Sequence, residues 1–183
     1  SADLAALTFD HLRDIARKIR DGSTDDYGQY WSYDKSNKKL DKPKPENDCR
    51  NALLSDLQDR LGRLGIDAQR ESSRADNKRT DILISYGGAN GFNVPVEAKK
   101  DDNPDLWRAI HEQLIPKYVR DPGADGHGIY LVFWFGVAKM KPAPDGGRKP
   151  RNAKELEERL RQTLAPEERH RIQICVIDCA LPF

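Results

Sequence analysis

Two segments with the alternating pattern of β-strands lie on either side of a glycine-rich loop, and their pairing constrains the fold more than any other feature of the chain. The segments cover residues 80–86 and 94–100, and the loop covers residues 87–91. Segments of this kind, joined by a short turn-forming loop, are typical of an antiparallel hairpin. The sequence therefore predicts that they pair with each other, symmetrically about Ala89.

The register of this hairpin decides which side chains meet. It pairs Tyr86 with Phe92, Ile84 with Val94, and Ile82 with Val96. Asp81 then falls opposite Glu97, with Cβ atoms about 5 Å apart. Because side chains alternate across a strand, Asp81, Glu97 and Lys99 share one face and the apolar residues share the other. We expect the apolar face to be buried and the two acids and the lysine to gather on the opposite face.

Adjacent carboxylates such as Asp81 and Glu97 repel each other unless a proton or a divalent cation neutralises them. Hard oxygen ligands suit Mg²⁺ or Mn²⁺, which makes both acids candidate metal ligands, with Lys99 beside whatever the metal holds. The alternative is an ordinary strand on which Glu97 and Lys99 form a surface ion pair and Asp81 merely starts its strand. Pro95 lacks a ladder donor, so we expect it at the beginning of the paired region or at a bulge that shifts the register.

Asp81, followed after fifteen residues by Glu97-Ala98-Lys99, resembles the signature of the PD-(D/E)XK nuclease superfamily, which has the restriction-endonuclease-like fold. Thr80 stands where the signature has proline. The resemblance implies that Asp81, Glu97 and the backbone carbonyl of Ala98 ligate Mg²⁺. It also implies that Lys99 positions or activates the attacking water.

Glu46 begins a helix predicted over residues 46–64, two turns before Leu53 and on the same buried face. The resemblance implies that an acid at this place reaches the metal directly or through water. The alternative is an acid favoured at a helix start by the macrodipole, and Asp48 is the neighbouring candidate.

Gln113 is expected on the face of a second helix, predicted over residues 104–119, that points inward or toward the sheet edge. RecB-type members of the superfamily resemble this chain in carrying a glutamine and a tyrosine after the Glu-x-Lys triplet, here Gln113 and Tyr118. The resemblance implies that Gln113 positions Lys99 or a phosphate. Pro116 lies between Gln113 and Tyr118 and is expected to kink or widen the helix.

The remaining pattern completes an α-β-β-β-α-β order, followed by a further helix and strand. The predicted elements are a helix at 4–20, strands at 66–71, 128–136 and 171–179, a polar turn at 72–78, a basic loop at 138–152 and an exposed charged helix at 153–164. The strand at 128–136 is apolar throughout, so we expect it to be buried on both faces and parallel to the strand bearing Glu97. This predicts an α/β fold with a restriction-endonuclease-like core, a mixed central sheet flanked by helices.

Composition places the chain in a reducing, aqueous compartment. No apolar run approaches the length of a membrane span and no signal peptide is visible, so we expect a cytoplasmic location and no membrane partner. Cys49, Cys175 and Cys179 lack a zinc-like spacing and are predicted to be buried thiols. The chain begins Ser1-Ala2-Asp3 and has a single methionine, so we expect one module of a larger protein, and a homodimer is left open.

Basic residues form two clusters although the net charge is only +1. The first cluster is Lys35, Lys38, Lys39, Lys42 and Lys44, and the second is Lys139, Lys141, Arg148, Lys149 and Arg151. Both are predicted to lie in loops, where they either neutralise phosphates or are simply solvated. The candidate nucleic-acid contacts are Lys38, Lys39, Lys42, Lys100, Arg148 and Lys149. Tyr27, Tyr30, Trp31 and Tyr33 near the first cluster either stack on bases or pin the loop to the domain.

The domain organisation expected from these patterns is an N-terminal helix with a basic, aromatic loop at 1–45 and a nuclease-like domain at 46–183, the resemblance covering 46–136. The predicted function is hydrolysis of phosphodiester bonds with Mg²⁺ or Mn²⁺ as the cofactor. The resemblance implies DNA as the substrate, and RNA is left open. It also implies a biological role in host defence or repair. The alternatives are a non-catalytic nucleic-acid-binding or assembly module with the same fold, and a structural domain of a larger protein.

Overall fold

The computed structural model describes residues 1–70, 80–88, 91–136 and 139–182. These residues form a five-stranded sheet in the order β3-β4-β5-β6-β7. The strands are β3 (Asp67–Gln69), β4 (Ile82–Tyr86), β5 (Phe92–Lys100), β6 (Gly128–Trp134) and β7 (Ile172–Asp178). Neighbours from β3 to β5 are antiparallel and neighbours from β5 to β7 are parallel, so the predicted mixed sheet is confirmed.

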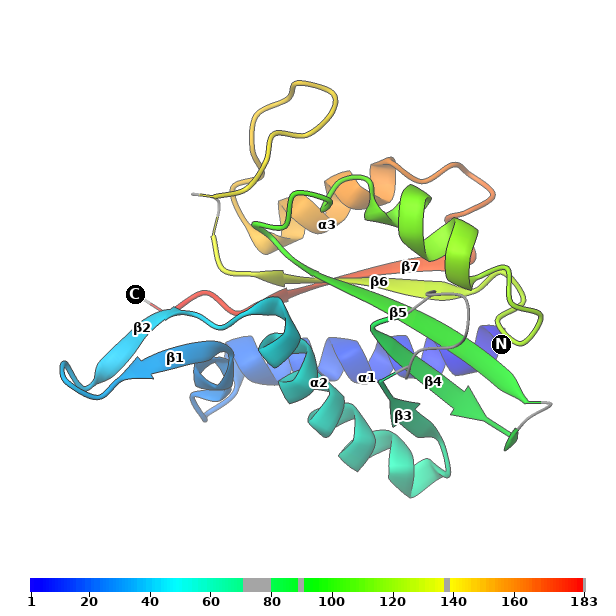
Figure 1. Ribbon diagram of the computed structural model, residues 1–183, viewed down its shortest axis with the longest axis horizontal. Coiled ribbons are helices and arrows are strands. Elements are labelled where there is room, and N and C mark those ends of the chain that lie inside the picture. The colour runs from blue at the N-terminus through cyan, green and yellow to red at the C-terminus, as the bar shows by residue number, and fades with distance from the viewer. Residues whose placement is uncertain (71–79, 89–90, 137–138, 183) are drawn as a thin grey trace.

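Helices cover both faces of this sheet (Figure 1). One face packs against α1 (Ala2–Asp21) and α2 (Glu46–Leu61). The other packs against the π-helix η4 (Ile110–Tyr118) and α3 (Ala153–Gln162). The 3-10 turns η1 (Asp26–Tyr30) and η2 (Gly62–Leu64) follow the first two helices. The described elements therefore form three layers, with β5 and β6 in the middle of the central one.

Strand β6 shows why the sheet needs two helical layers. Each of its residues is buried. Alternate side chains, beginning at Ile129, join the core under α1 and α2, and the intervening ones, beginning at Tyr130, join the core under η4 and α3. The predictions of a strand buried on both faces and parallel to β5 are confirmed.

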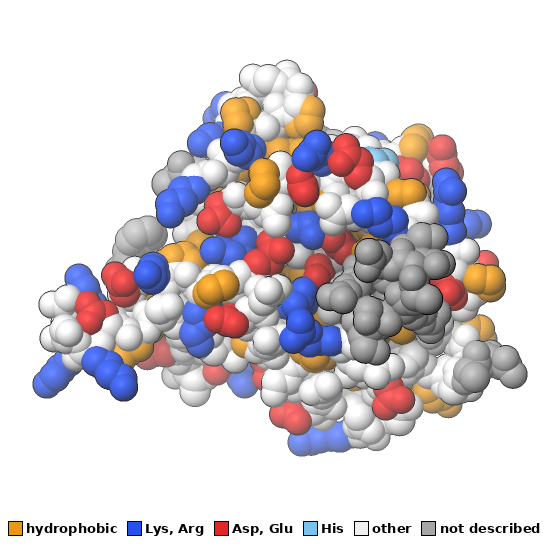
Figure 2. Space-filling view, in the orientation of Figure 1, with side chains coloured by type: hydrophobic (Ala, Val, Ile, Leu, Met, Phe, Trp, Pro, Cys, Tyr) orange, Lys and Arg blue, Asp and Glu red, His pale blue; other side chains and the backbone are white. Residues whose placement is uncertain are grey.

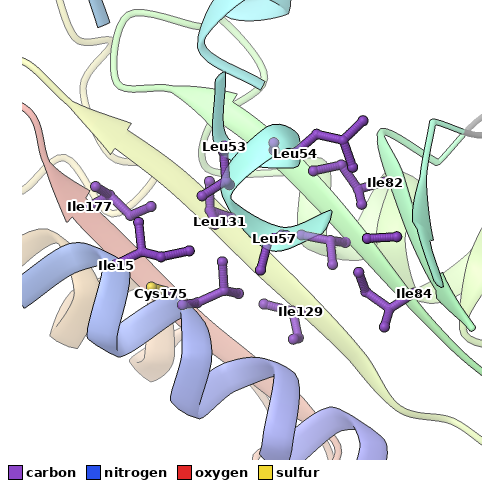
Figure 3. Packing of buried hydrophobic residues seen from close by; sticks show 14 of the residues in the cluster. Ile15, Leu53, Leu54, Leu57, Ile82, Ile84, Ile129, Leu131, Cys175 and Ile177 are labelled. Atoms are coloured by element: carbon purple, nitrogen blue, oxygen red, sulfur yellow. The ribbon is translucent and has the colours of Figure 1, made fainter. Parts of the chain in front are cut away.

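Leucines of α2 fill the core on the first face, as Figure 3 shows. The labelled side chains are Leu53, Leu54 and Leu57 of α2, Ile82 and Ile84 of β4, Ile15 of α1, Ile129 and Leu131 of β6, and Cys175 and Ile177 of β7. Residues from both sides of position 45 share this core. The cysteines are free thiols and buried, as predicted.

Helix α2 is shorter than the sequence pattern predicts. Leu61 ends the α-helix and is fully buried, whereas Leu64 lies in η2 and is 51% exposed. Gly65 then adopts a φ of +70°, a conformation that glycine reaches without steric cost. The 3-10 turn rotates Leu64 away from the core stripe because its winding differs from 3.6 residues per turn.

The second predicted helix is also altered. Residues 104–108 form turns, and a π-helix runs from Ile110 to Tyr118 with Pro116 inside it. Proline has no N–H to donate and its ring crowds the preceding turn, so the chain winds more widely there. The expectation of a widened helix at Pro116 is confirmed.

A hairpin replaces the loop predicted before residue 45. Strands β1 (Trp31–Asp34) and β2 (Lys39–Pro43) pair antiparallel apart from the central sheet. The prediction that the first basic cluster lies in a loop is therefore wrong for Lys39 and Lys42. The sequence analysis overlooked the turn, in which the Asp34 carboxylate accepts hydrogen bonds from the Ser36 and Asn37 amides.

The remaining expectations from the sequence differ in what the described residues show of them. Helix α3 is not simply exposed, because Leu156 and Leu160 are buried in the second core. The polar turn predicted at 72–78, the end of the strand predicted at 66–71 and the start of the loop predicted at 138–152 lie at least in part outside the described residues. Within the described chain, no helix has the length and apolar character needed to cross a membrane.

Replacing Leu57 with alanine tests the central packing. Leu57 is fully buried between α2 and the sheet, and such a truncation should lower the free energy of unfolding by about 2–5 kcal/mol. The matched substitution Leu64→Ala, at an exposed position, should lower it by less than about 0.5 kcal/mol. Urea unfolding followed by circular dichroism measures both, and equal losses would contradict this core.

Candidate functional site

The β4–β5 hairpin has the predicted register. Ile82 pairs with Val96, Ile84 with Val94, and Tyr86 with Phe92. Pro95 sits opposite Leu83 without a bulge, and pairing of β5 with β6 begins one residue later. Pro95 thus marks the beginning of the stretch paired on both sides, because its missing N–H would interrupt a ladder there. Ala89 and Asn90 of the hairpin loop lie outside the described residues.

Asp81 lies directly before β4 and links three elements. Its Oδ2 accepts a hydrogen bond of 2.9 Å from the backbone N–H of Ala98 in β5. Its Oδ1 is paired with the guanidinium of Arg50 in α2. Arg50 also donates to Asn47 Oδ1 at 2.9 Å. The carboxylate therefore ties β5 to α2 at the end of the sheet.

Arg50 was missed in the sequence analysis. Only 8% of its surface is exposed, and it lies on the same helical stripe as Leu53 and Leu57. The available signal was a basic residue within an apolar stripe. A buried arginine needs a partner, and the structure supplies it from Asp81.

Glu97 and Lys99 extend from the face of β5 opposite Ala98, as predicted. Both are buried, with 3% and 7% of their surfaces exposed. Lys99 Nζ lies 2.5 Å from Glu97 Oε1 and 4.0 Å from Asp81 Oδ2. One ammonium group therefore contacts Glu97 closely and borders Asp81, so the three residues form one charge cluster.

Burial is the main cause of the perturbed titration of Glu97. Together with the charge of Asp81 it raises the pKa of Glu97 to about 7, although the Lys99 ammonium acts in the opposite direction. Burial lowers the pKa of Lys99, but the charges of Glu97 and Asp81 outweigh it, so the net shift is upward. Glu97 Oε2 is buried and has no hydrogen-bond partner among the described residues.

Glu46 connects the start of α2 to the end of β5. Its Oε2 accepts hydrogen bonds of 2.8 Å from the Lys100 amide and from Asn103 Nδ2. It therefore lies close to the charge cluster, and its charge contributes to raising the pKa values of Glu97 and Lys99. Asp48, the neighbouring candidate, is exposed.

The other predicted site residues have different surroundings. Gln113 Nε2 donates to Asp105 Oδ2 at 3.5 Å, and Tyr118 packs against the second core. Lys100 Nζ lies 3.6 Å from Asp102 Oδ2 and 5.4 Å from the centre of the Phe135 ring. The structure therefore gathers Glu46, Asp81, Glu97 and Lys99, and it does not place the hydrogen bond of Gln113 on Lys99.

Asp101 and Tyr130 are buried polar groups that the sequence analysis did not single out. Asp101 accepts hydrogen bonds of 2.8 Å from the amides of Phe135 and Gly136, and burial raises its pKa to about 6. Tyr130, which is opposite Glu97 in the sheet register, donates to Leu106 O at 2.7 Å. These bonds hold the ends of β5 and β6 and the segment before η4 in place around Glu97.

Cations and acids are intermixed on the surface where the start of α2 and the end of β5 meet (Figure 2). The potential metal ligands there are carboxylates and a carbonyl, which suit a hard cation. Among the described residues, no group of three or more histidines, cysteines or acids has the arrangement of a metal site. The oxygens near the charge cluster that are of the kind a hard cation binds belong to Asp81, Glu97 and the Ala98 carbonyl.

The fold and the site define a mixed α/β protein with a buried acid and ammonium cluster at the end of its central strand. The chain belongs to the domain family DUF8371, a domain of unknown function, which matches residues 15–137. That range contains Glu46, Arg50, Asp81, Glu97 and Lys99. No curated protein and no solved structure matches the chain.

The raised pKa of Glu97 predicts a pH-dependent stability. The folded chain keeps a proton on Glu97 up to about pH 7, whereas the unfolded chain releases it near 4.5. Because the folded state binds more protons in this window, the free energy of unfolding should fall as pH rises, by at most about 1.4 kcal/mol per pH unit from this group. Glu97→Gln removes this contribution and should make the dependence between these two pH values shallower, while the raised pKa of Asp101 keeps a slope of the same sign below about pH 6.

Urea midpoints measured across that window provide the comparison. Glu112→Gln, at an exposed position on η4, is the matched control and should keep the wild-type dependence. Identical pH profiles for wild type and Glu97→Gln would contradict the raised pKa.

Proposed function

We propose that this chain is a metal-dependent nuclease that hydrolyses phosphodiester bonds of DNA. The observation that carries the proposal is the convergence of Asp81, Glu97 and Lys99 at one end of β5, with both acids bordering one ammonium group. A surface ion pair would leave Glu97 and Lys99 in solvent, whereas here both are buried. Burying Glu97 and Lys99 next to the half-buried Asp81 is costly unless these charges are used or fully paired.

The arrangement of elements also supports a restriction-endonuclease-like core. Helix α2 precedes the antiparallel strands β3, β4 and β5, and the segment with η4 then leads to the parallel strand β6. This is the α-β-β-β-α-β order expected from the sequence. The candidate acids lie on β5 and at the start of β4, in the middle of that order.

Mg²⁺ or Mn²⁺ is the proposed cofactor, and the chain offers it a suitable set of oxygens. Glu97 Oε2 is buried and lacks a hydrogen-bond partner in the described structure, so a cation there would satisfy it. Ala98 donates its N–H toward Asp81. The N–H and C=O of one strand residue point to the same edge, so the Ala98 carbonyl faces the Asp81 side as well.

The residues have distinct proposed roles. Asp81, Glu97 and the Ala98 carbonyl would hold the cation, and Glu46 would keep the end of β5 in place through the Lys100 amide. A bound Mg²⁺ would polarise the phosphate and lower the pKa of a water molecule. The raised pKa of Lys99 keeps it protonated at neutral pH, so its role is to orient that water or to offset charge on the phosphate rather than to act as a base.

A non-catalytic nucleic-acid-binding or assembly module is the second candidate, and one observation favours it. Asp81 is already paired with Arg50, and Glu97 with Lys99, so the protein's own cations neutralise both acids. A module of this kind would keep the cluster as a structural link between α2 and β5. The two candidates differ in their need for a divalent cation.

Replacing Lys99 with alanine tests the catalytic role. Cleavage of plasmid and linear duplex DNA in Mg²⁺ should fall by about 10²–10³-fold, the usual range for loss of one group that stabilises developing charge. The fold should persist, because Glu97 can take up a proton once the ammonium is gone. Lys117→Ala, at an exposed position on η4, is the control and should keep wild-type activity. A fully active Lys99→Ala variant would exclude this role.

Removal of the metal gives an independent test. EDTA should abolish cleavage, and Mg²⁺ at ten times its dissociation constant should stabilise the wild-type fold by about 1.4 kcal/mol. The double variant Asp81→Asn with Glu97→Gln should show no such stabilisation in a thermal unfolding assay. Cleavage that persists in EDTA, or equal stabilisation of the variant, would favour a different function. Parallel incubation with RNA identifies the preferred nucleic acid.

A further inference from the structure

We propose that the β1–β2 hairpin binds the phosphate backbone of double-stranded DNA, independently of base sequence. The choice of DNA as partner rests on the proposed nuclease function. The hairpin would hold the duplex at one side of the charge cluster. It is a separate two-stranded sheet that extends away from the three-layered body (Figure 1).

The base of the hairpin is firmly anchored. Trp31 Nε1 donates to Cys179 O at 2.7 Å, and the Trp31 ring meets the Phe135 ring edge-on at 5.4 Å. Lys44 is held through its amide by Tyr30 O and through its Nζ by Gln29 O. The direction in which the hairpin extends is therefore set by contacts with the core.

The end of the hairpin carries cations available to a partner. Four lysines between the anchored ends are exposed, and none has an ion pair with a described carboxylate: Lys35, Lys38, Lys39 and Lys42. The same segment has two acids, Asp34 and Asp41, which leaves a net charge of +2. Asp34 is turned onto the hairpin's own turn, where it accepts bonds from Ser36 and Asn37. Figure 2 shows basic side chains at the outer end of the hairpin.

The second basic cluster is different, because its arginines are engaged within the protein. Arg148 and Arg151 both pair with Glu155, at 3.2 and 3.1 Å. Arg159 nearby pairs with Asp145. A phosphate that bound these arginines would have to displace their carboxylate partners. A phosphate that bound the hairpin lysines would displace only solvent and counterions. The structure thus distinguishes two clusters that look equivalent in the sequence.

The hairpin is also well placed relative to the charge cluster. Strand β2 ends at Pro43, three residues before Glu46, whose carboxylate binds the Lys100 amide. Five strand residues span about 16 Å at 3.3 Å per residue. This is about half of the 34 Å turn of a DNA duplex. A duplex at the end of β5 can therefore reach the hairpin lysines within one helical turn.

The side chains indicate phosphate contacts rather than base recognition. Lysine is a compact point charge on a flexible stem and carries no planar hydrogen-bonding pattern. Tyr33 is the large exposed aromatic of the described hairpin, at 58% exposure, and a single ring is not a stacking platform for successive bases. Binding should therefore depend strongly on salt and weakly on sequence.

Fluorescence anisotropy with a labelled duplex in EDTA tests this without cleavage. The hairpin variant replaces Lys35, Lys38, Lys39 and Lys42 with glutamine, and the control variant makes the same change at four exposed lysines outside the hairpin: Lys117, Lys139, Lys141 and Lys154. The slope of log affinity against log salt should fall by about 3–4 in the hairpin variant. It should fall by less than about 1 in the control.

Two further measurements make each result decisive. Replacing the same four hairpin lysines with arginine should restore the wild-type slope, and urea midpoints verify that each variant folds. Unchanged affinity and slope in the glutamine hairpin variant would overturn the proposal. So would equal losses in both glutamine variants, or binding of the hairpin to anionic lipid vesicles with no binding to DNA.

A cleavage assay on the same duplex with Mg²⁺ separates this inference from the proposed function. Hairpin-dependent binding without any cleavage by the wild type would retain the hairpin's role and reject the nuclease. Cleavage with hairpin-independent binding would retain the nuclease and reject the hairpin's role.

Discussion

The pairing of Asp81 with the amide of Ala98 and with Arg50 is the interaction on which the site depends. Through this one carboxylate, the residue before β4 contacts both strand β5 and helix α2. A carboxylate that is largely shielded from water, as Asp81 is, needs partners for its oxygens, so loss of either partner would destabilise the other contact. The carboxylate thereby determines how α2 approaches the end of the sheet, and with it where Glu46 lies.

Charge balance explains why the cluster can be buried at all. Glu46, Asp81 and Glu97 are matched by Arg50, Lys99 and backbone N–H groups. The match is incomplete at Glu97, where one oxygen has no partner among the described residues and the pKa is raised to about 7. Glu97 Oε2 and Arg50 Nε are therefore the two buried polar atoms of this cluster that lack a hydrogen-bond partner in the described structure.

The β1–β2 hairpin and the charge cluster are positioned by the same short segment of the chain. The chain passes from β2 through Lys44 and Pro45 directly into α2, so the same few residues position the hairpin lysines and Glu46. Tyr30 and Trp31 at the other end of the hairpin are buried in the core. Aromatic residues that the sequence left open as base-stacking groups thus act in this region chiefly as anchors, except for Tyr33.

The sequence alone determined the β4–β5 register and the sharing of one face by Glu97 and Lys99, because both follow from the period of two along a strand. It also determined the core stripe of α2 and the buried strand β6, since their apolar periods are clear. It did not reveal Arg50 as the partner of Asp81, or that the arginines of the second basic cluster pair with Glu155 whereas the four exposed hairpin lysines have no described carboxylate partner. Only the tertiary structure decided these, because the partners of a charged side chain come from distant segments whose separation local patterns do not encode.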